Sequence, residues 1–260
     1  MSLPHFFLEN QVLPLEQEQE FALQVSADDA KHAKVLRLQP GEHIAVVDAS
    51  SDYFECEVAS FDSGVIRVSI AQRLDSPKRP RVTLVQGLAK GDKMDSIVRH
   101  ATEVGICAFV PLVCERSVVK LDAKKAPARQ ARWKAIAKSA SMQSGRSNMP
   151  EVSLPMRVAE AAQALVGSSA VLICWEEAPL ASTIRIALDR FLAASGENPA
   201  DTRVAIVIGP EGGLAEAEVQ AFLSACPNAS AVSLGSSILR TETAGIVAPA
   251  LVMYELEARR

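Results

Sequence analysis

The chain has 260 residues and a mass of 27.8 kDa, with 27 basic against 31 acidic side chains and 48% hydrophobic residues. This is an ordinary globular composition, and a chain of this length buries enough surface to form a core without disulfides or metal ions. A disulfide scaffold is therefore excluded.

The cysteines and histidines point to no metal site. The cysteines are odd in number and lie mostly in apolar runs, as buried free thiols of a reducing compartment do; they are Cys56, Cys107, Cys114, Cys174 and Cys226. No Cys-x-x-Cys pair occurs, and the four histidines lack the spacing of metal ligands. We therefore predict no bound metal.

The sequence also argues against secretion and membrane insertion. The N-terminus lacks the basic and apolar stretches of a signal peptide. The longest apolar run, residues 245–253, is about half as long as a membrane span and contains Pro249. We therefore predict a cytoplasmic protein without a membrane segment.

Residues 1–75 are predicted to form a small β-rich domain, a barrel. Strand-like alternation marks residues 44–47, 53–58 and 65–70, and turn-forming residues separate these runs. A polar connector that contains two prolines, residues 75–80, follows them. This connector marks the natural domain boundary.

Residues 76–260 are predicted to form a second domain of the α/β class. Continuous apolar runs, typical of strands buried on both faces of a parallel sheet, alternate there with helical patterns. The expected strands are residues 82–85, 107–110, 170–174, 204–208 and 231–234. The expected helices are residues 94–104, 128–142, 158–166, 182–194 and 215–225.

Charge is distributed unevenly along the chain. Residues 76–147 carry 15 basic and 5 acidic side chains, whereas the blocks before and after them are net acidic. In the helix that Pro127 is expected to begin, the basic residues have no acidic partner one turn away; they are Arg129, Arg132, Lys134 and Lys138. Such charge indicates a polyanion partner, and a solvated helix face is the alternative.

Open α/β sheets bind ligands at the carboxyl ends of their strands, and two loops follow such ends. The first loop, residues 208–213, reads Ile-Gly-Pro-Glu-Gly-Gly and precedes a helix expected to begin near Leu214. Its glycines would let the backbone approach a ligand, but a plain strand-to-helix turn fits the pattern equally well. Glu211 is either a capping residue or a functional carboxylate.

The second loop, residues 234–244, also lies between a strand and a helix. Thr241 or Thr243 can cap that helix, and Arg240 and Glu242 near its start are compatible with routine helix-end electrostatics. A charged pair and several hydroxyl residues close to Gly235 are more than a cap requires, so we favour a functional loop.

Two sequence strings carry a family resemblance. Gly209-Pro-Glu-Gly-Gly213, followed by Leu234-Gly-x-x-Ile-Leu-Arg-x-Glu-Thr-Ala244, closely resembles the RsmE family of SPOUT-class methyltransferases, which methylate N3 of a uridine in 16S ribosomal RNA. Shorter matches run in order along nearly the whole chain, among them Lys90-Gly-Asp-Lys-Met94 and Thr102-Glu-Val-Gly105. The chain departs from the family at His100, where a lysine is usual, and helix-surface placement is the simplest interpretation of that histidine.

The resemblance implies a PUA-like β-barrel at residues 1–75, then a SPOUT domain at residues 76–260 with a parallel sheet and a C-terminal trefoil knot. It also implies the cofactor S-adenosyl-L-methionine, held largely by backbone in three loops. The cofactor contacts that carry over are Leu172, Trp175, Ile208, Gly209, Glu211, Gly212, Gly213, Leu234, Gly235, Ser237, Ile238 and Leu239.

Methylation of uridine N3 needs an unpaired base, a cation or donor for charge that develops on the uracil oxygens, and a proton acceptor. We assign the role of cation or donor to Arg240, and that of proton acceptor to Glu242 or water. The expected RNA contacts are His32, Arg37, Arg116, Lys120, Lys124, Lys125, Arg132, Gln143 and Arg146. For Gln143 and Arg146, a polar cap at the helix end is the alternative.

The family implies 16S ribosomal RNA as partner, within the small ribosomal subunit, and a homodimer to which the apolar helix of residues 243–256 could contribute. Two other functions compete with this one. A non-enzymatic RNA-binding or ribosome-assembly protein would have no use for the loop at residues 234–244. A SPOUT enzyme that methylates ribose 2′-hydroxyls would lack the first domain and the string from Ile238 to Thr243.

Overall fold

The computed structural model describes residues 3–14, 19–76, 78–119 and 124–259. The chain divides into two compact units, one made of Met1–Pro77 with Lys138–Met149 and the other of Lys78–Ala137 with Pro150–Arg260. The division near residue 77 lies close to the connector seen in the sequence. The return of residues 138–149 to the first unit was not predicted, because nothing in the local sequence marks it.

The first unit contains a five-stranded sheet and one helix. The strand order is β1-β3-β4-β5-β2, with β1 parallel to β3 and the other pairs antiparallel. The elements are β1 (His5–Phe7), β2 (Phe21–Ala22), α1 (Ala27–Leu36), β3 (His43–Val47), β4 (Tyr53–Asp62) and β5 (Val65–Leu74). The three predicted strands fall within β3, β4 and β5. Helix α1 was not predicted, since most of its apolar residues are alanines that form no clear apolar stripe, but Ser26 caps it by accepting from the Asp29 N–H.

Helix α3 (Ala126–Gln143) joins the first unit through its C-terminal turns. Met142 packs in the core of this unit with Phe6 and Phe54, both of which are fully buried. The Lys138 ammonium lies 2.9 Å from a Glu9 carboxylate oxygen and 2.7 Å from one of Asp29. Hydrophobic burial and these ion pairs therefore fix residues 138–149 to the first unit.

The second unit is built on a parallel sheet with the strand order β12-β10-β11-β6-β7-β8, to which β9 adds by pairing with β7. Its strands are β6 (Arg81–Gly87), β7 (Ala108–Val113), β8 (Glu151–Val152), β9 (Met156–Arg157), β10 (Ala170–Cys174), β11 (Arg203–Ile208) and β12 (Ala229–Val232). Its helices besides α3 are α2 (Lys93–Val104), α4 (Val158–Ala164), α5 (Ile184–Ser195), α6 (Glu216–Ala225) and α7 (Thr241–Glu257), with a short 3-10 turn at Pro199–Asp201. The predicted parallel α/β architecture is confirmed.

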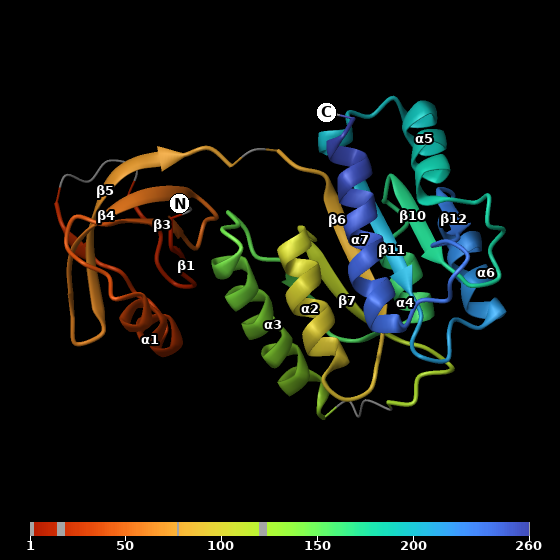
Figure 1. The fold of residues 1–260 in the computed structure, drawn as a ribbon, viewed down its shortest axis with the longest axis horizontal. Coiled ribbons are helices and arrows are strands. Elements are labelled where there is room, and N and C mark those ends of the chain that lie inside the picture. Colours follow the sequence, from red (N-terminus) through yellow and green to blue (C-terminus); the bar gives the residue numbers. More distant parts are fainter. Residues whose placement is uncertain (1–2, 15–18, 77, 120–123, 260) are drawn as a thin grey trace. The chain divides into compact units, whose positions relative to one another are not determined.

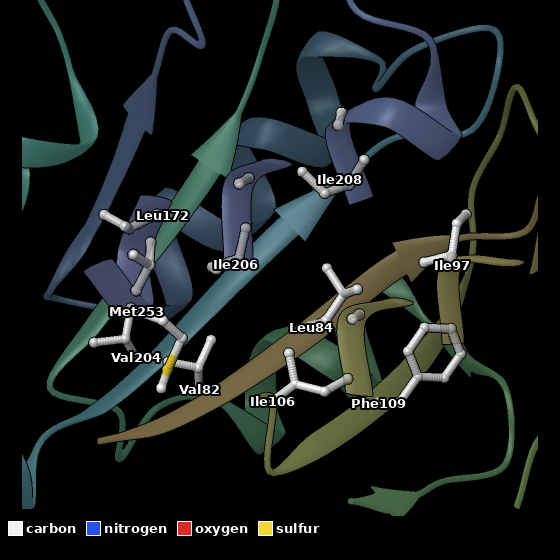
Figure 2. Packing of buried hydrophobic residues seen from close by; sticks show 14 of the residues in the cluster. Val82, Leu84, Ile97, Ile106, Phe109, Leu172, Val204, Ile206, Ile208 and Met253 are labelled. Carbon is white, nitrogen blue, oxygen red and sulfur yellow. The ribbon is translucent and has the colours of Figure 1, made fainter. Parts of the chain in front are cut away.

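Side chains of the central strands alternate between two buried faces, as expected for a parallel sheet covered on both sides. On one face Leu84, Leu172 and Ile206 pack with residues of α2 and α7, including Ile97 and Met253 (Figure 2). On the other face, Val171 and Val207 pack with residues of α4 and α6. In Figure 1, α2 and α7 lie side by side over the first of these faces.

Helix α7 follows an edge strand but packs over the middle of the sheet, against β6 and β11. It continues through Pro249, and the first residue of the helix is Thr241. Over the part of the chain that the structure describes, none of the helices combines the length and the hydropathy needed to cross a bilayer. The loops after β10, β11 and β12 meet at the start of α7, and this junction contains the cavity described next.

Candidate active site

A cavity of about 790 Å³ opens at the carboxyl ends of β10, β11 and β12. Its walls are the segments 174–176, 208–213 and 233–242, joined by Ala244, by Lys93 from the start of α2 and by Leu180. A cavity of this size and position is typical of a small-molecule site in an α/β protein. The two loops singled out in the sequence therefore line the same cavity.

Most residues expected to contact a cofactor line this cavity. They are Trp175, Ile208, Gly209, Glu211, Gly212, Gly213, Leu234, Gly235, Ser237, Ile238 and Leu239, together with both residues assigned to the chemistry, Arg240 and Glu242. Leu172 is not among the lining residues. Its side chain is fully buried in the core beneath α7, because its position in β10 points it to the packed face of the sheet (Figure 2).

The glycines of the 208–213 turn are required by internal packing. A Cβ at Gly212 would lie 2.9 Å from the Cβ of Arg116, and one at Gly209 would lie 2.9 Å from the backbone of residues 213 and 214. Gly213 has a φ of +71°, and a Cβ there would collide with the Glu176 carboxylate. Of the two interpretations that the sequence left open, these contacts support the plain turn, since the glycines make it compact.

The 234–240 segment has the opposite character. Gly235 has a φ of +114°, which requires glycine, and no other atom lies within 4 Å of the place where a Cβ would stand. Ile238 is 89% exposed although its side chain is large and apolar. The exposed backbone and side chains of this segment leave room for a ligand along the cavity wall.

Thr241 fastens the two loops together. Its hydroxyl donates to the Gly209 carbonyl at 2.6 Å and accepts from Gln86 Nε2 at 2.9 Å. Gln86 is fully buried at the end of β6. The suggestion that Thr241 or Thr243 caps α7 is wrong, since Arg240 occupies the N-cap position and makes no capping hydrogen bond.

Lys93 connects both loops to α2, and sequence reasoning missed it as a site residue. Its ammonium lies 3.2 Å from Glu211 Oε1 and 3.1 Å from Glu242 Oε2. Glu211 Oε1 also accepts a hydrogen bond of 3.0 Å from the Lys90 N–H. Glu211 is thus not the cap of α6, whose N-cap residue is Ala215, and its carboxylate joins the charged cluster of the cavity. Lys93 belongs to the family-like string Lys90-Gly-Asp-Lys-Met94, but sequence spacing alone does not show that two distant glutamates contact this lysine.

The cluster keeps its charges across neutral pH. The nearby Glu242 carboxylate, opposed by desolvation, raises the pKa of Lys93, and the Glu211 contact adds to the rise. The backbone N–H of Glu242 lowers the pKa of that carboxyl, and Lys93 and Arg240 lower it further. For Glu211, burial works to raise the pKa, but the backbone hydrogen bonds and Lys93 together hold it below its ordinary value. A glutamate in this state is a poor proton acceptor.

Arg240 is the cation of this site that its neighbours leave unpaired. Its side chain is exposed at the cavity wall and, within the described residues, forms no ion pair or hydrogen bond. An arginine that lines a cavity without a carboxylate partner can donate to the oxygen atoms of a bound ligand. This arrangement fits the role predicted for Arg240.

Two basic residues of the second unit that were expected to contact RNA have protein partners. The Arg116 guanidinium donates to the carbonyls of Gly212, at 3.2 Å, and Leu214, at 3.5 Å. Arg132 forms an ion pair with Asp95. The charge of the α3 helix is thus partly compensated, by acidic residues that are distant in sequence and invisible to a search one turn away.

The other expected RNA contacts are distributed over both units. Lys124 and Lys125 are exposed before α3, and Lys120 lies outside the described residues. In the first unit, Arg37 and Gln143 are exposed, whereas His32 and Arg146 are half-buried. His100, on α2, hydrogen-bonds through Nδ1 to the Ser96 carbonyl oxygen at 2.8 Å. It does not line the cavity.

The chain is similar to characterised families over most of its length. Residues 76–253 match the model of an RNA methyltransferase domain. The protein named ribosomal RNA small subunit methyltransferase E of Bacillus subtilis is 32% identical over 99% of this chain and 99% of its own length. The protein of the same name in Mycobacterium bovis is 35% identical over 86% of this chain and 83% of its own.

A solved structure agrees with these matches. The crystal structure of a ribosomal RNA small subunit methyltransferase E from Neisseria gonorrhoeae, bound to S-adenosyl methionine, superposes with a TM-score of 0.78. It is 27% identical in sequence, and the match covers 97% of each chain. The resemblance noted in the sequence is confirmed, and the chain belongs to the ribosomal RNA small subunit methyltransferase E family, RsmE.

Proposed function

We propose that this protein is an S-adenosylmethionine-dependent methyltransferase that methylates N3 of a uridine in 16S ribosomal RNA. The observation that carries this proposal is the cavity at the sheet edge, where an unpaired Arg240 stands beside loops with exposed backbone. Membership of the RsmE family supports the same function.

The residues present fit the cofactor. The cavity volume of about 790 Å³ lies within the range of small-molecule sites. The indole N–H of Trp175, which lines the cavity, is buried and has no hydrogen-bond partner among the described residues. Together with the open side of Gly235, this orphaned donor is what a heterocyclic ligand with nitrogen acceptors would use. When bound, S-adenosylmethionine supplies a methyl group activated by a positive sulfur.

The chain's own residues supply orientation and charge stabilisation. The walls at residues 208–213 and 234–239 would hold the cofactor, and Arg240 would donate to a uracil oxygen as N3 loses its proton. Because Lys93 engages the Glu242 carboxylate and its pKa is lowered, we assign the proton to water rather than to Glu242. The uridine must be unpaired to present N3 to this site.

RNA contacts belong to exposed cations of each unit. In the second unit, Lys125, Arg129 and Lys134 have no carboxylate within ion-pair distance among the described residues. Lys124 and Lys125 are exposed, as a phosphate contact requires. In the first unit we retain His32, Arg37, Gln143 and Arg146 as candidates.

The finer features of the fold and assembly are part of this proposal. A PUA-like barrel is consistent with the mixed five-stranded sheet of the first unit. A trefoil knot is supported by the path of residues 233–241, which leave the edge strand β12 and reach Gly209 and Gln86 in the middle of the sheet. A homodimer is supported by α7, which carries no charged residue between positions 244 and 254 and leaves Leu251 and Tyr254 exposed.

Mass mapping of methylated nucleosides tests the function. We expect 16S ribosomal RNA from cells that lack this protein to lose one N3-methyluridine, and the purified protein with S-adenosylmethionine to restore it. A lost ribose 2′-O-methyl group would favour the related SPOUT activity. An unchanged set of modified nucleosides would favour a non-enzymatic RNA-binding protein.

A further inference from the structure

The charged cluster at the start of α2 and α7 contains two cations and two carboxylates. Lys93 lies between Glu211 and Glu242, at 3.2 and 3.1 Å, while Arg240 has no ion-pair partner within the described residues. Arg240 precedes Glu242 by two residues and is close enough for its charge to stabilise that carboxylate. Both Lys93 and Arg240 can therefore interact with the Glu242 carboxylate, and Lys93 is the one that forms the ion pair.

We propose that Lys93 is a positioning residue that keeps the Glu242 carboxylate away from Arg240, so that the Arg240 guanidinium stays available to the methyl acceptor. This inference rests on the proposed function, because it needs Arg240 to act on a bound base. It assigns Lys93 no contact with cofactor or RNA.

The geometry supports this role at three points. The Lys93 side chain is about as exposed as those of its partners, 32% against 25% for each glutamate, so it is held at the cavity wall rather than in the core. Glu211 has a second donor, the Lys90 N–H, and stays in place if Lys93 is removed. Glu242 Oε2 is buried and, among the described residues, has the Lys93 ion pair but no hydrogen-bond partner, so losing Lys93 would leave Arg240 as the remaining cation whose charge acts on it.

These contacts lead us to expect different methyl-transfer rates in three variants. In Lys93→Met, Glu242 would pair with Arg240, and methyl transfer would fall by at least about tenfold, as when a charge-stabilising donor is withdrawn. In Lys93→Met with Glu242→Gln, the competing carboxylate is gone, and the rate would recover most of that loss. Lys93→Arg would retain most of the wild-type rate because the charge remains.

Two measurements besides activity separate this role from a loosened site. Affinity for S-adenosylmethionine, measured by calorimetric titration, should change less than about threefold in Lys93→Met, since Glu211 keeps its Lys90 contact. Modification of Arg240 by phenylglyoxal, followed by peptide mass spectrometry, should slow in Lys93→Met and return to the wild-type rate in the double variant. Arg185, exposed on α5, serves as the internal standard.

A matched control comes from another lysine of the same unit. Lys78 pairs with Asp201 at 3.3 Å, away from the cavity, and Lys78→Met should change neither rate nor affinity. The proposal is overturned if the double variant is no more active than Lys93→Met, or if Arg240 modification is the same in all variants. If Lys93→Met and Lys93→Gln both fail to fold, Lys93 is a folding residue and the proposal also fails. A wild-type protein that transfers no methyl group would instead refute the proposed function itself.

Discussion

The two glycine-bearing loops of the cavity look alike in sequence but differ in what their glycines do. In the 208–213 turn, each glycine meets protein atoms that would clash with a side chain, so the turn is a rigid wall. In the 234–240 segment, Gly235 faces no protein atom within 4 Å. Glycines in a loop can therefore be required for close protein packing or can leave space beside the backbone for a ligand. Only the surrounding contacts distinguish the two cases.

The wall is rigid because other segments hold it. Arg116 binds the carbonyls of Gly212 and Leu214, and Thr241 binds that of Gly209. The Glu115 N–H and the Ala215 N–H both donate to Glu218, which fixes the start of α6 beside the turn. The open segment has few such ties, which suits a surface that a ligand covers.

The largest expected effect comes from adding a methyl group to the rigid wall. In Gly212→Ala the new Cβ would stand 2.9 Å from the Arg116 Cβ, and overpacking of this kind costs about 1–3 kcal/mol. We expect a lower free energy of unfolding and loss of cofactor binding together, measured by denaturant unfolding and calorimetry. Gly167→Ala, where the nearest atom is 4.0 Å away, is the control. Equal behaviour of the two variants would contradict the packed-wall description.

Removing the Thr241 hydroxyl, which links the two loops, should lower the free energy of unfolding by nearly as much. Thr241→Val leaves the Gly209 carbonyl and Gln86 Nε2 without the hydroxyl, and stranded buried polar groups cost about 1–3 kcal/mol. Thr243→Val, at an exposed position in the same turn, should change stability little. Thermal unfolding of the two variants compares them directly. If Thr243→Val is the more destabilised, the assignment of the tie to Thr241 is wrong.

RNA binding should respond to charge outside the cavity. Charge reversal at Lys124 and Lys125 should reduce the slope of log affinity against log salt by about 2, because each phosphate contact releases roughly one counterion. Cofactor affinity should not change, since neither residue lines the cavity. RNA binding that is indifferent to salt would reduce the basic block to a solvated surface.

The smallest effect concerns pH. The pKa of Glu242 is lowered, so its ion pair is present at neutral pH and is lost only as the pH falls through that lowered value. The pKa of Lys93 is raised, so its charge persists until the pH rises past the raised value. The methyl-transfer rate should therefore show no acid limb between about pH 5 and pH 8 from Glu242. An acid limb that disappears in Glu242→Gln would restore Glu242 as the proton acceptor.

Much of the second unit could be predicted from the sequence, because its strands are continuous apolar runs and its helices follow turn signals. The expected strand at residues 204–208 and the observed β11 (Arg203–Ile208) nearly coincide. The cavity loops could be predicted too, since they follow those strands. Leu172 is the exception. It lies inside β10, before the strand ends at Cys174, and its side chain is buried in the core rather than in the loop that lines the cavity.

The long-range contacts could not be predicted. Lys93 meets Glu211 and Glu242 across more than a hundred residues of sequence. Asp95 also pairs with Arg132, and Asp29 with Lys138, although the partners are far apart in the sequence. Local spacing reports only partners one turn away, so a helix that looks uncompensated in sequence can be paired in the folded chain.

Calorimetric titration of S-adenosylmethionine into the wild-type protein and Gly235→Ala tests the central claim most directly. We expect one binding site per wild-type chain. In Gly235→Ala we expect an affinity at least about tenfold lower, while stability falls only by the cost of the strained backbone, about 1–2 kcal/mol. Absence of binding to the wild type, or equal affinity in a folded Gly235→Ala, would contradict the claim that this cavity holds the methyl donor.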